Sequence, residues 1–161
     1  MTRKEYNTAV DDHADGLYRF MLKSMKDVDA AKDVVQDVFT KLWEKHADVQ
    51  FEKSKPYLFT AGYRTMIDYF RKNNRLSSME GSHQDMQHHS EQYSDLKEIL
   101  SEAVEKLPEV QKSAILLRDY EGYSYKEIGE ILELQESQVK VYIFRARKFL
   151  QNYLKSIETV L

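Results

Sequence analysis

The sequence predicts an all-α protein made of two small helical domains. The 161 residues include only two prolines and five glycines, too few to punctuate the many turns of a sandwich or barrel. With 42% hydrophobic and 32% charged residues, the composition suits helices that each carry one apolar stripe and one solvated face. The segment 76–94 is rich in Ser, Gln and His and lacks an apolar period. It predicts a flexible linker between domains 1–75 and 95–161.

The composition excludes several classes of function. A chain without cysteine has no disulfide scaffold, thiolate zinc site or cysteine nucleophile. The sequence has no phosphate-binding glycine loop and no nucleophile motif, so we expect no catalytic residues, no enzyme activity and no cofactor. The linker histidines His83, His88 and His89 are spaced irregularly and lack supporting carboxylates, which favours a linker over a metal site.

We also expect a cytoplasmic protein with no membrane insertion. No apolar run approaches the roughly 18 residues that a membrane helix needs, and the first ten residues lack the apolar stretch of a secretory signal.

Three helices are predicted in the first domain, over residues 4–25, 28–47 and 55–73. Pro56 suits the first turn of the third. The second helix is strongly amphipathic. Its apolar stripe consists of Ala31, Val34, Val35, Val38, Phe39, Leu42 and Trp43.

Four helices are predicted in the second domain, over about 95–106, from Pro108 to Gly122, from Ser124 to about 132, and from Glu136 onward. Ser124 and Glu127 have the spacing of a capping box. The last helix is predicted to bury one apolar stripe, formed by Val139, Ile143, Phe149 and Leu150.

Charge is segregated along the chain although the net charge is only −3. Residues 53–75 hold six bases and one acid, and residues 137–157 hold five bases and no acid. Residues 95–136 hold eleven acids and five bases. Two separate basic surfaces on an otherwise acidic chain favour phosphate contacts at two places. Ordinary solvated helix faces remain the alternative explanation.

A helix-turn-helix is predicted near the C-terminus. The short helix after Ser124, the tight connection at 133–135 and the longer basic helix have its layout. The second helix would enter the major groove, with its first residues at base edges and its later cations at phosphates. A helical adaptor that binds no DNA stays open at this point, although it would not explain two basic surfaces.

Three longer segments resemble two modules of bacterial RNA polymerase sigma factors. Residues 29–46 (DAAKDVVQDVFTKLWEKH) and 57–75 (YLFTAGYRTMIDYFRKNNR) look like region 2 of the sigma-70 family, and residues 103–150 look like region 4. The joint presence and order of both modules resemble the extracytoplasmic-function (ECF) group, which keeps only these two domains. The resemblance implies a region 2 helical bundle, a linker and a region 4 helix-turn-helix.

The resemblance implies that the second helix binds the β′ clamp helices of core polymerase. Asp33, Gln36 and Asp37 stand at the matching positions, on the polar face where they can bond a partner. Plain solvated surface is the alternative for these three residues. Trp43 is either an anchor of the same contact or part of the core.

The third helix, by resemblance, holds the promoter −10 element and its melted strand. Unpaired bases need aromatic faces, and a freed backbone needs cations. The candidate residues are Lys53, Lys55, Tyr57, Arg64, Arg71, Lys72 and Arg75.

The helix-turn-helix, by resemblance, reads the −35 element. The family usually has glycine at Glu133, a Ser or Thr cap at Gln135 and often arginine at Tyr142, so the sequence preference does not transfer. The candidate residues are Ser124, Lys126, Ser137, Gln138, Lys140, Tyr142, Arg145, Arg147 and Lys148.

The function implied is that of a sigma factor that binds core RNA polymerase, directs it to promoters and assists their opening. The implied partners are core polymerase, through its β′ clamp helices and β subunit, promoter DNA and an anti-sigma factor. A helix-turn-helix regulator that binds duplex DNA without acting as a sigma subunit is the alternative. Only the sigma factor needs the 29–46 face to bind polymerase.

We further expect a compact free state. A linker of about 19 residues averages only ~25 Å as a coil and reaches at most ~65 Å. The two promoter elements of the family lie roughly 55 Å apart along the duplex. In the free protein the acidic surface of 95–136 is expected to lie against the basic segment 53–75, in a contact that salt loosens.

Overall fold

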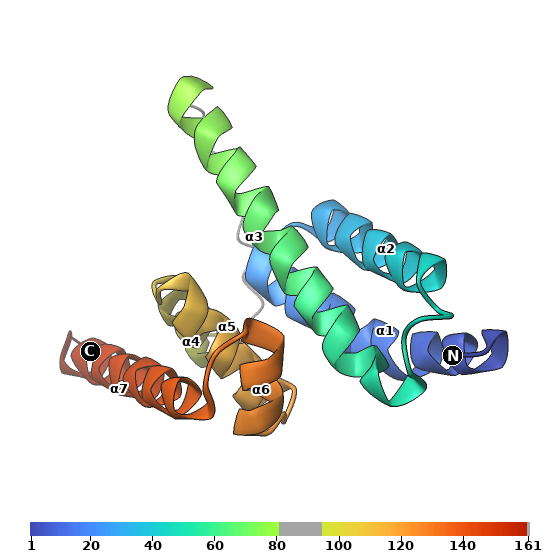
Figure 1. Ribbon diagram of the computed structural model, residues 1–161. Coiled ribbons are helices and arrows are strands. Elements are labelled where there is room, and N and C mark those ends of the chain that lie inside the picture. Colours follow the sequence, from blue (N-terminus) through green and yellow to red (C-terminus); the bar gives the residue numbers. More distant parts are fainter. Residues whose placement is uncertain (81–94, 161) are drawn as a thin grey trace.

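The computed structural model describes residues 1–80 and 95–160 of the chain (Figure 1). Every regular element in these two stretches is helical, which confirms the all-α prediction. The three histidines considered as metal ligands lie outside the described residues. Within them, no helix is long and apolar enough to cross a membrane.

The first half of the chain is a bundle of three helices, α1 (Arg3–Met25), α2 (Val28–Glu44) and α3 (Ser54–Glu80), with a 3-10 turn, η1 (Phe51–Lys53), before α3. Thr2 and Glu5 form a capping box at the start of α1, and the Asp27 side chain caps α2 by accepting from the Ala30 N–H. The three helices share one core. Its fully buried members include Leu17, Phe20, Met21, Leu42, Leu58, Phe59 and Met66.

The third helix is longer than the sequence pattern predicts. It runs to Glu80, so the first five residues of the predicted linker, 76–80, belong to the helix. No proline or glycine occurs between Gly62 and Gly81, so no helix-breaking residue ends the helix earlier. Residues 81–94, the rest of the predicted linker, lie outside the described residues.

The second half consists of α4 (Asp95–Glu105), α5 (Glu109–Ile115), a π-helical turn η2 (Leu116–Tyr120), α6 (Tyr125–Leu132) and α7 (Glu136–Val160). The capping box of Ser124 and Glu127 is present. One prediction of burial is wrong. Phe149 is exposed, because Ala146 continues the buried row of Val139 and Ile143.

The turn between α6 and α7 depends on two unusual positions. Glu133 ends α6 in the left-handed conformation, with φ of 59°, which explains why glycine is usual there. The Leu134 N–H donates to the Gly129 carbonyl at 2.9 Å. A Cβ atom on Gly129 would lie 2.7 Å from the Leu134 carbonyl oxygen, so this close approach of the turn to α6 requires glycine.

The two halves pack against each other. The Arg19 guanidinium donates two hydrogen bonds of 3.0 Å to Glu121, whose side chain is only 5% exposed. The ammonium of Lys112, a residue that is 4% exposed, donates to the Ser24 carbonyl at 3.0 Å and pairs with Glu105 at 2.8 Å. The expected contact of acids from 95–136 with bases from 53–75 is present, since Glu127 pairs with Lys55 and Glu133 with Arg64.

Candidate nucleic-acid and polymerase interfaces

The polar face of α2 does not pack against the core. Asp33, Gln36 and Asp37 are all exposed, and the Asp37 carboxylate lies 3.1 Å from the Lys41 ammonium on the next turn. Asp33 and Asp37 also line a groove of about 590 Å³ between α2 and α3, whose other wall includes Tyr69. Carboxylates and a tyrosine ring therefore lie together at one place on this face.

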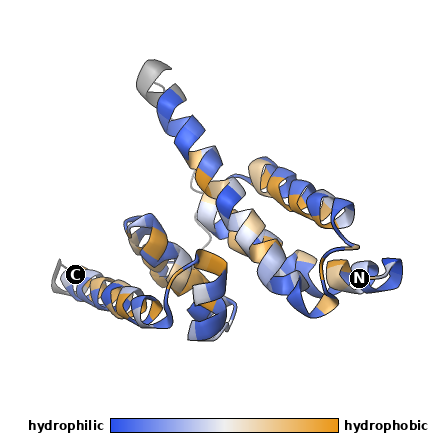
Figure 2. Ribbon diagram, in the orientation of Figure 1, coloured by the Kyte–Doolittle hydropathy of each residue, from blue (hydrophilic) through white to orange (hydrophobic). Residues whose placement is uncertain are grey.

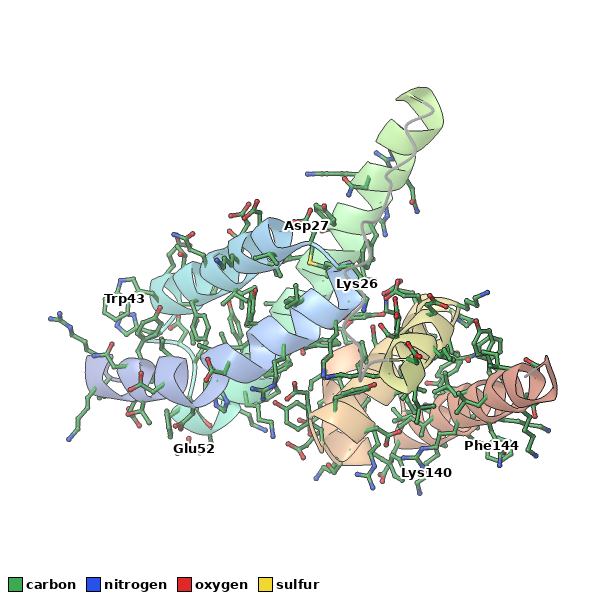
Figure 3. The ribbon with its side chains drawn as sticks, turned by 180° about the vertical axis from the view of Figure 1, so that it is seen from behind. Lys26, Asp27, Trp43, Glu52, Lys140 and Phe144 are labelled. Atoms are coloured by element: carbon green, nitrogen blue, oxygen red, sulfur yellow. The ribbon has the colours of Figure 1, made fainter. Side chains whose placement is uncertain are left out.

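Trp43 lies at the surface beside this face and not in the core. Its side chain is 41% exposed and stacks on His46 with ring centroids 4.3 Å apart. The Tyr6 ring meets the indole edge-on at 5.0 Å. Figure 3 shows Trp43 near the outer end of α2. The two neighbouring rings fix an exposed indole, which is the arrangement that an interface anchor needs.

The first half of α3 carries cations that are already paired. The Lys55 ammonium lies 2.6 Å from a Glu127 carboxylate oxygen and over the ring of Tyr123, and Arg64 pairs with Glu133. The hydrogen bond from Lys55 lowers the pKa of Glu127 below its usual value. Both carboxylates come from α6 and its C-cap, so the second half of the chain covers this part of α3.

Two further candidates lie at the start of α3. Lys53 is exposed beside a small cavity that Lys55 and Glu127 also line. Tyr57 is half-buried and packs against the core, so only part of its ring faces solvent.

The second half of α3 stands away from the other helices (Figure 1). Arg71, Lys72 and Arg75 are exposed there, and the Arg71 guanidinium lies 4.0 Å from Asp68 on the preceding turn. Figure 2 shows this end of the helix as hydrophilic. It is a cationic rod that a nucleic-acid backbone can approach from several sides.

The helix-turn-helix begins both of its helices with side-chain caps. The Ser124 hydroxyl accepts from the Glu127 N–H and caps α6, so this hydroxyl is already bonded within the protein. The Gln138 amide oxygen accepts from the Gln135 N–H at 3.0 Å, so Gln138 makes up for the poor cap at Gln135. Lys126 and Ser137 are exposed near these helix starts.

Most cations of α7 point to solvent, with one exception. Lys140, Arg145 and Lys148 are exposed, whereas Arg147 donates to Asp119 at 2.6 Å and fastens α7 to the π-helical turn. Tyr142 is half-buried. Arg147 is therefore first of all a structural residue of the second half.

One exposed apolar residue of α7, Phe144, was missed by the sequence reasoning. Phe144 is 67% exposed and lies next to the cations of the same helix, and Val141, at 45% exposed, is on the surface as well. Figure 3 shows Lys140 and Phe144 pointing away from the rest of the protein. The signal was present, because a helical row through Val139 and Ile143 places Phe144 on the other face.

Comparison with protein families assigns both halves. Residues 9–76, covering most of α1 to α3, match the model "Sigma-70 region 2". Residues 97–150, from α4 into α7, match "Sigma-70, region 4". The RNA polymerase sigma factor YlaC of Bacillus subtilis is 30% identical over 165 residues, which cover 91% of this chain and 95% of the relative.

The chain belongs to the sigma-70 family. Its group is also clear, since the ECF RNA polymerase sigma factor SigM of Bacillus subtilis is 29% identical over 84% of this chain and 86% of the relative. As an ECF sigma factor, the protein directs RNA polymerase to promoters. A regulator with only a helix-turn-helix would not contain the region 2 bundle, so that alternative is disfavoured.

A solved structure places the two regions of a related sigma factor in a similar way. The sigma factor RpoE of Bartonella quintana, crystallised with the anti-sigma factor NepR, superposes with a TM-score of 0.79 at 27% identity. The superposition covers 94% of this sigma factor and 98% of that chain. One superposition covers regions 2 and 4 together, so the two halves are placed relative to each other in a similar way in that relative.

Proposed function

We propose that this sigma factor uses three separate surfaces: the polar face of α2 for core polymerase, α3 for the −10 element and the α6–α7 hairpin for the −35 element. The corresponding domains are residues 1–75 and 95–161, joined by 76–94. The protein acts in the cytoplasm by binding alone, with no catalytic step. The observation that carries this proposal is the exposure of Asp33, Gln36 and Asp37 on a face that the fold does not use.

The polymerase surface is proposed to include Trp43 as its apolar anchor. Carboxylates and an amide on one helix face can bond a second helix directly, and a fixed, partly exposed indole adds buried area at low entropic cost. The β′ clamp helices and the β subunit are the polymerase elements that we propose as partners.

The −10 surface is proposed to consist of the seven residues predicted from the sequence. Lys53, Arg71, Lys72 and Arg75 hold the backbone of the melted strand, and Lys55 and Arg64 join them once they are uncovered. Tyr57 offers a ring edge for an unstacked base. Cations and aromatic faces together favour the single strand over the duplex, which assists opening.

The −35 surface is proposed to consist of residues that contact base edges, called readers, and residues that hold phosphates, called clamps. Ser137, Gln138 and Lys140 lie at the start of α7, where a recognition helix meets base edges. Lys126, Arg145 and Lys148 hold phosphates, while Ser124, Tyr142 and Arg147 mainly position the hairpin. Phe144 and Val141 are added as apolar contacts for thymine methyl groups.

An anti-sigma factor is proposed as a regulatory partner. The support is the arrangement of regions 2 and 4, which resembles that of RpoE crystallised with NepR. A protein that holds both regions in this arrangement keeps the sigma factor from polymerase.

The deciding experiment is transcription in vitro with sigma-free core enzyme. Addition of the protein should produce transcripts with defined starts, and sequencing of those starts should reveal one pair of elements upstream. Core enzyme alone and core enzyme with the Asp33→Lys/Asp37→Lys variant serve as controls. Specific duplex binding without any polymerase-dependent transcript would contradict the proposal.

A further inference from the structure

The end of α1 meets α4 and α5 through polar groups, in a contact called the seam from here on. The Lys112 ammonium of α5 donates to the Ser24 carbonyl of α1 at 3.0 Å and lies 2.8 Å from the Glu105 carboxylate of α4. Lys26, the C-cap of α1, donates to the Ser101 hydroxyl of α4 at 3.0 Å. Figure 3 shows Lys26 where the end of α1 approaches the second half of the chain. The seam therefore joins region 2 to region 4.

Two buried polar atoms at the seam have no hydrogen-bond partner among the described residues. One is the hydroxyl oxygen of Ser24, a residue that is only 2% exposed. The other is the Oε1 atom of Glu109, which lies one turn before Lys112 on α5. A buried polar atom without a partner costs free energy relative to its hydrated state. Water can reach both atoms when the halves part, so separation recovers this cost.

Glu109 is the titratable member of this pair. Its place in the first turn of α5 favours the carboxylate, and so does Lys112. Burial nevertheless raises the pKa of Glu109 above its ordinary value of 4.5, and the charge of Glu105 adds to the increase. Lys26 lies 3.8 Å from Glu105 on the α1 side. On α3, burial raises the pKa of Tyr63, and the charge of Glu109 adds to that increase, so Glu109 acts across the boundary between the regions.

We propose that the packing of region 4 on region 2 is linked to a proton on Glu109, which binds when the seam closes and leaves when it opens. The proposal rests on the function proposed above in one respect, because one chain must open to hold both promoter elements. In the open chain the Glu109 carboxyl is hydrated and loses its proton as an ordinary glutamate does. Opening therefore releases a proton, and a rise in pH favours it.

The packed state should gain stability as the pH falls. A carboxyl whose pKa is higher in the packed state binds its proton more tightly there, and this gain is lost as the pH rises from 4.5 through the raised pKa. One proton changes the ratio of open to packed chains by at most about tenfold per pH unit. The ion pair of Glu127 with Lys55 responds in another range, because its hydrogen bond with Lys55 lowers the pKa of Glu127 below 4.5.

Energy transfer between two labels measures the ratio of open to packed chains without DNA or polymerase. The chain has no cysteine, so Lys32→Cys on α2 and Lys155→Cys on α7 provide the label sites. Arg19→Gln in the same chain removes the ion pair with Glu121 and increases the open fraction. The ratio of open to packed chains should rise from pH 5 to pH 8. Glu109→Gln should abolish this rise and keep the chain packed at pH 8, because an amide needs no proton to be neutral.

Two further variants serve as controls for charge and for the seam. Glu102→Gln removes the same charge at an exposed position of α4 and should leave the rise with pH unchanged. Ser24→Ala removes the uncharged buried hydroxyl, so it should favour packed chains by the same factor at every pH. An equal rise with Glu109→Gln and without it, or no rise in either chain, would overturn the proposal.

Carbon NMR of the glutamate carboxyls measures the proton directly in the full chain. The Glu109 signal, identified by its absence from Glu109→Gln, should titrate above the ordinary value of 4.5. A midpoint at or below 4.5 would overturn the proposal as well. Transcription in vitro at one fixed pH tests the proposed function separately. Loss of promoter-dependent transcripts would contradict that function and leave the titration unchanged, whereas failure of the proton linkage would appear only in the titration and the energy transfer.

Discussion

The basic surfaces of α3 and α7 have similar charge but different availability. On α7, Lys140, Arg145 and Lys148 face solvent, and the paired Arg147 is bound within its own half. On α3, Lys55 and Arg64 are bound by acids of the other half. The difference teaches that equal charge in the sequence does not mean equal availability, because the cations of α7 face solvent whereas Lys55 and Arg64 already have acidic partners in the other half.

The largest effect is expected at the polymerase surface. It tests whether DNA binding by α3 depends on polymerase while DNA binding by α7 does not. Asp33→Lys/Asp37→Lys should abolish core-polymerase binding and promoter-dependent transcription, because it reverses the charge of the contact face. Both residues are exposed, so the free energy of unfolding should change little. Duplex binding by α7 at low salt should persist.

Pull-down with core enzyme and a transcription assay measure this prediction. Lys32→Glu, an exposed reversal on the same helix, is the control for charge alone. Retention of core enzyme by the double variant at wild-type affinity would contradict the assignment of the α2 face.

The next effect isolates α7 from α3. Gly129→Ala should destabilise the α6–α7 hairpin by about 1–3 kcal/mol, because the new Cβ atom would lie 2.7 Å from the Leu134 backbone oxygen. The free energy of unfolding in urea and the affinity for duplex DNA should both fall, while core-polymerase binding through α2 remains. At Gly16 the nearest atom to a new Cβ lies at 3.5 Å, so Gly16→Ala should be far milder. Equal effects of the two substitutions would contradict the close approach described for the turn.

A smaller effect compares clamps with readers on α7. Arg145→Ala and Lys148→Ala should each weaken duplex binding on all sequences and lower the slope of log K against log salt by about one. Gln138→Ala should instead change the order of preferred −35 sequences, with a small added loss of stability from the missing cap. Binding titrations at several salt concentrations on a set of duplexes measure both. If Lys148→Ala changes the order of preferred −35 sequences and Gln138→Ala does not, the assignment of base contacts and phosphate contacts would be wrong.

The smallest effect concerns the acid that covers α3. The pKa of Glu127 is lowered mainly by its hydrogen bond with Lys55, so its contribution to stability is present above the ordinary value of 4.5. That contribution is lost as the pH falls through the lowered pKa. Glu127→Gln should therefore cost stability at pH 7, by less than about 1 kcal/mol after solvent screening, and less below pH 4.5. Urea unfolding of both proteins at pH 7 and below pH 4.5 measures the difference in their free energies of unfolding. This difference should be smaller at the lower pH.

The short-range features of this protein follow from its sequence. All seven α-helices of the described residues begin within one residue of their predicted starts, since prolines, glycines and caps such as Ser124 act locally. The polar face of α2 follows from helical spacing alone, and so does the segregation of charge. The joint order of the two modules was enough to indicate the sigma-70 family.

The tertiary structure decided what each side chain does in that framework. Trp43 and Phe149 are compatible with the core by periodicity, and only the packing of neighbouring helices leaves them at the surface. Arg147 and Lys148 are alike in sequence, yet only Arg147 meets Asp119. The cover over Lys55 joins residues 72 positions apart. Helical periodicity extends over a few turns, so the sequence predicted opposite charges, and the meeting of α6 with α3 determined which of them pair.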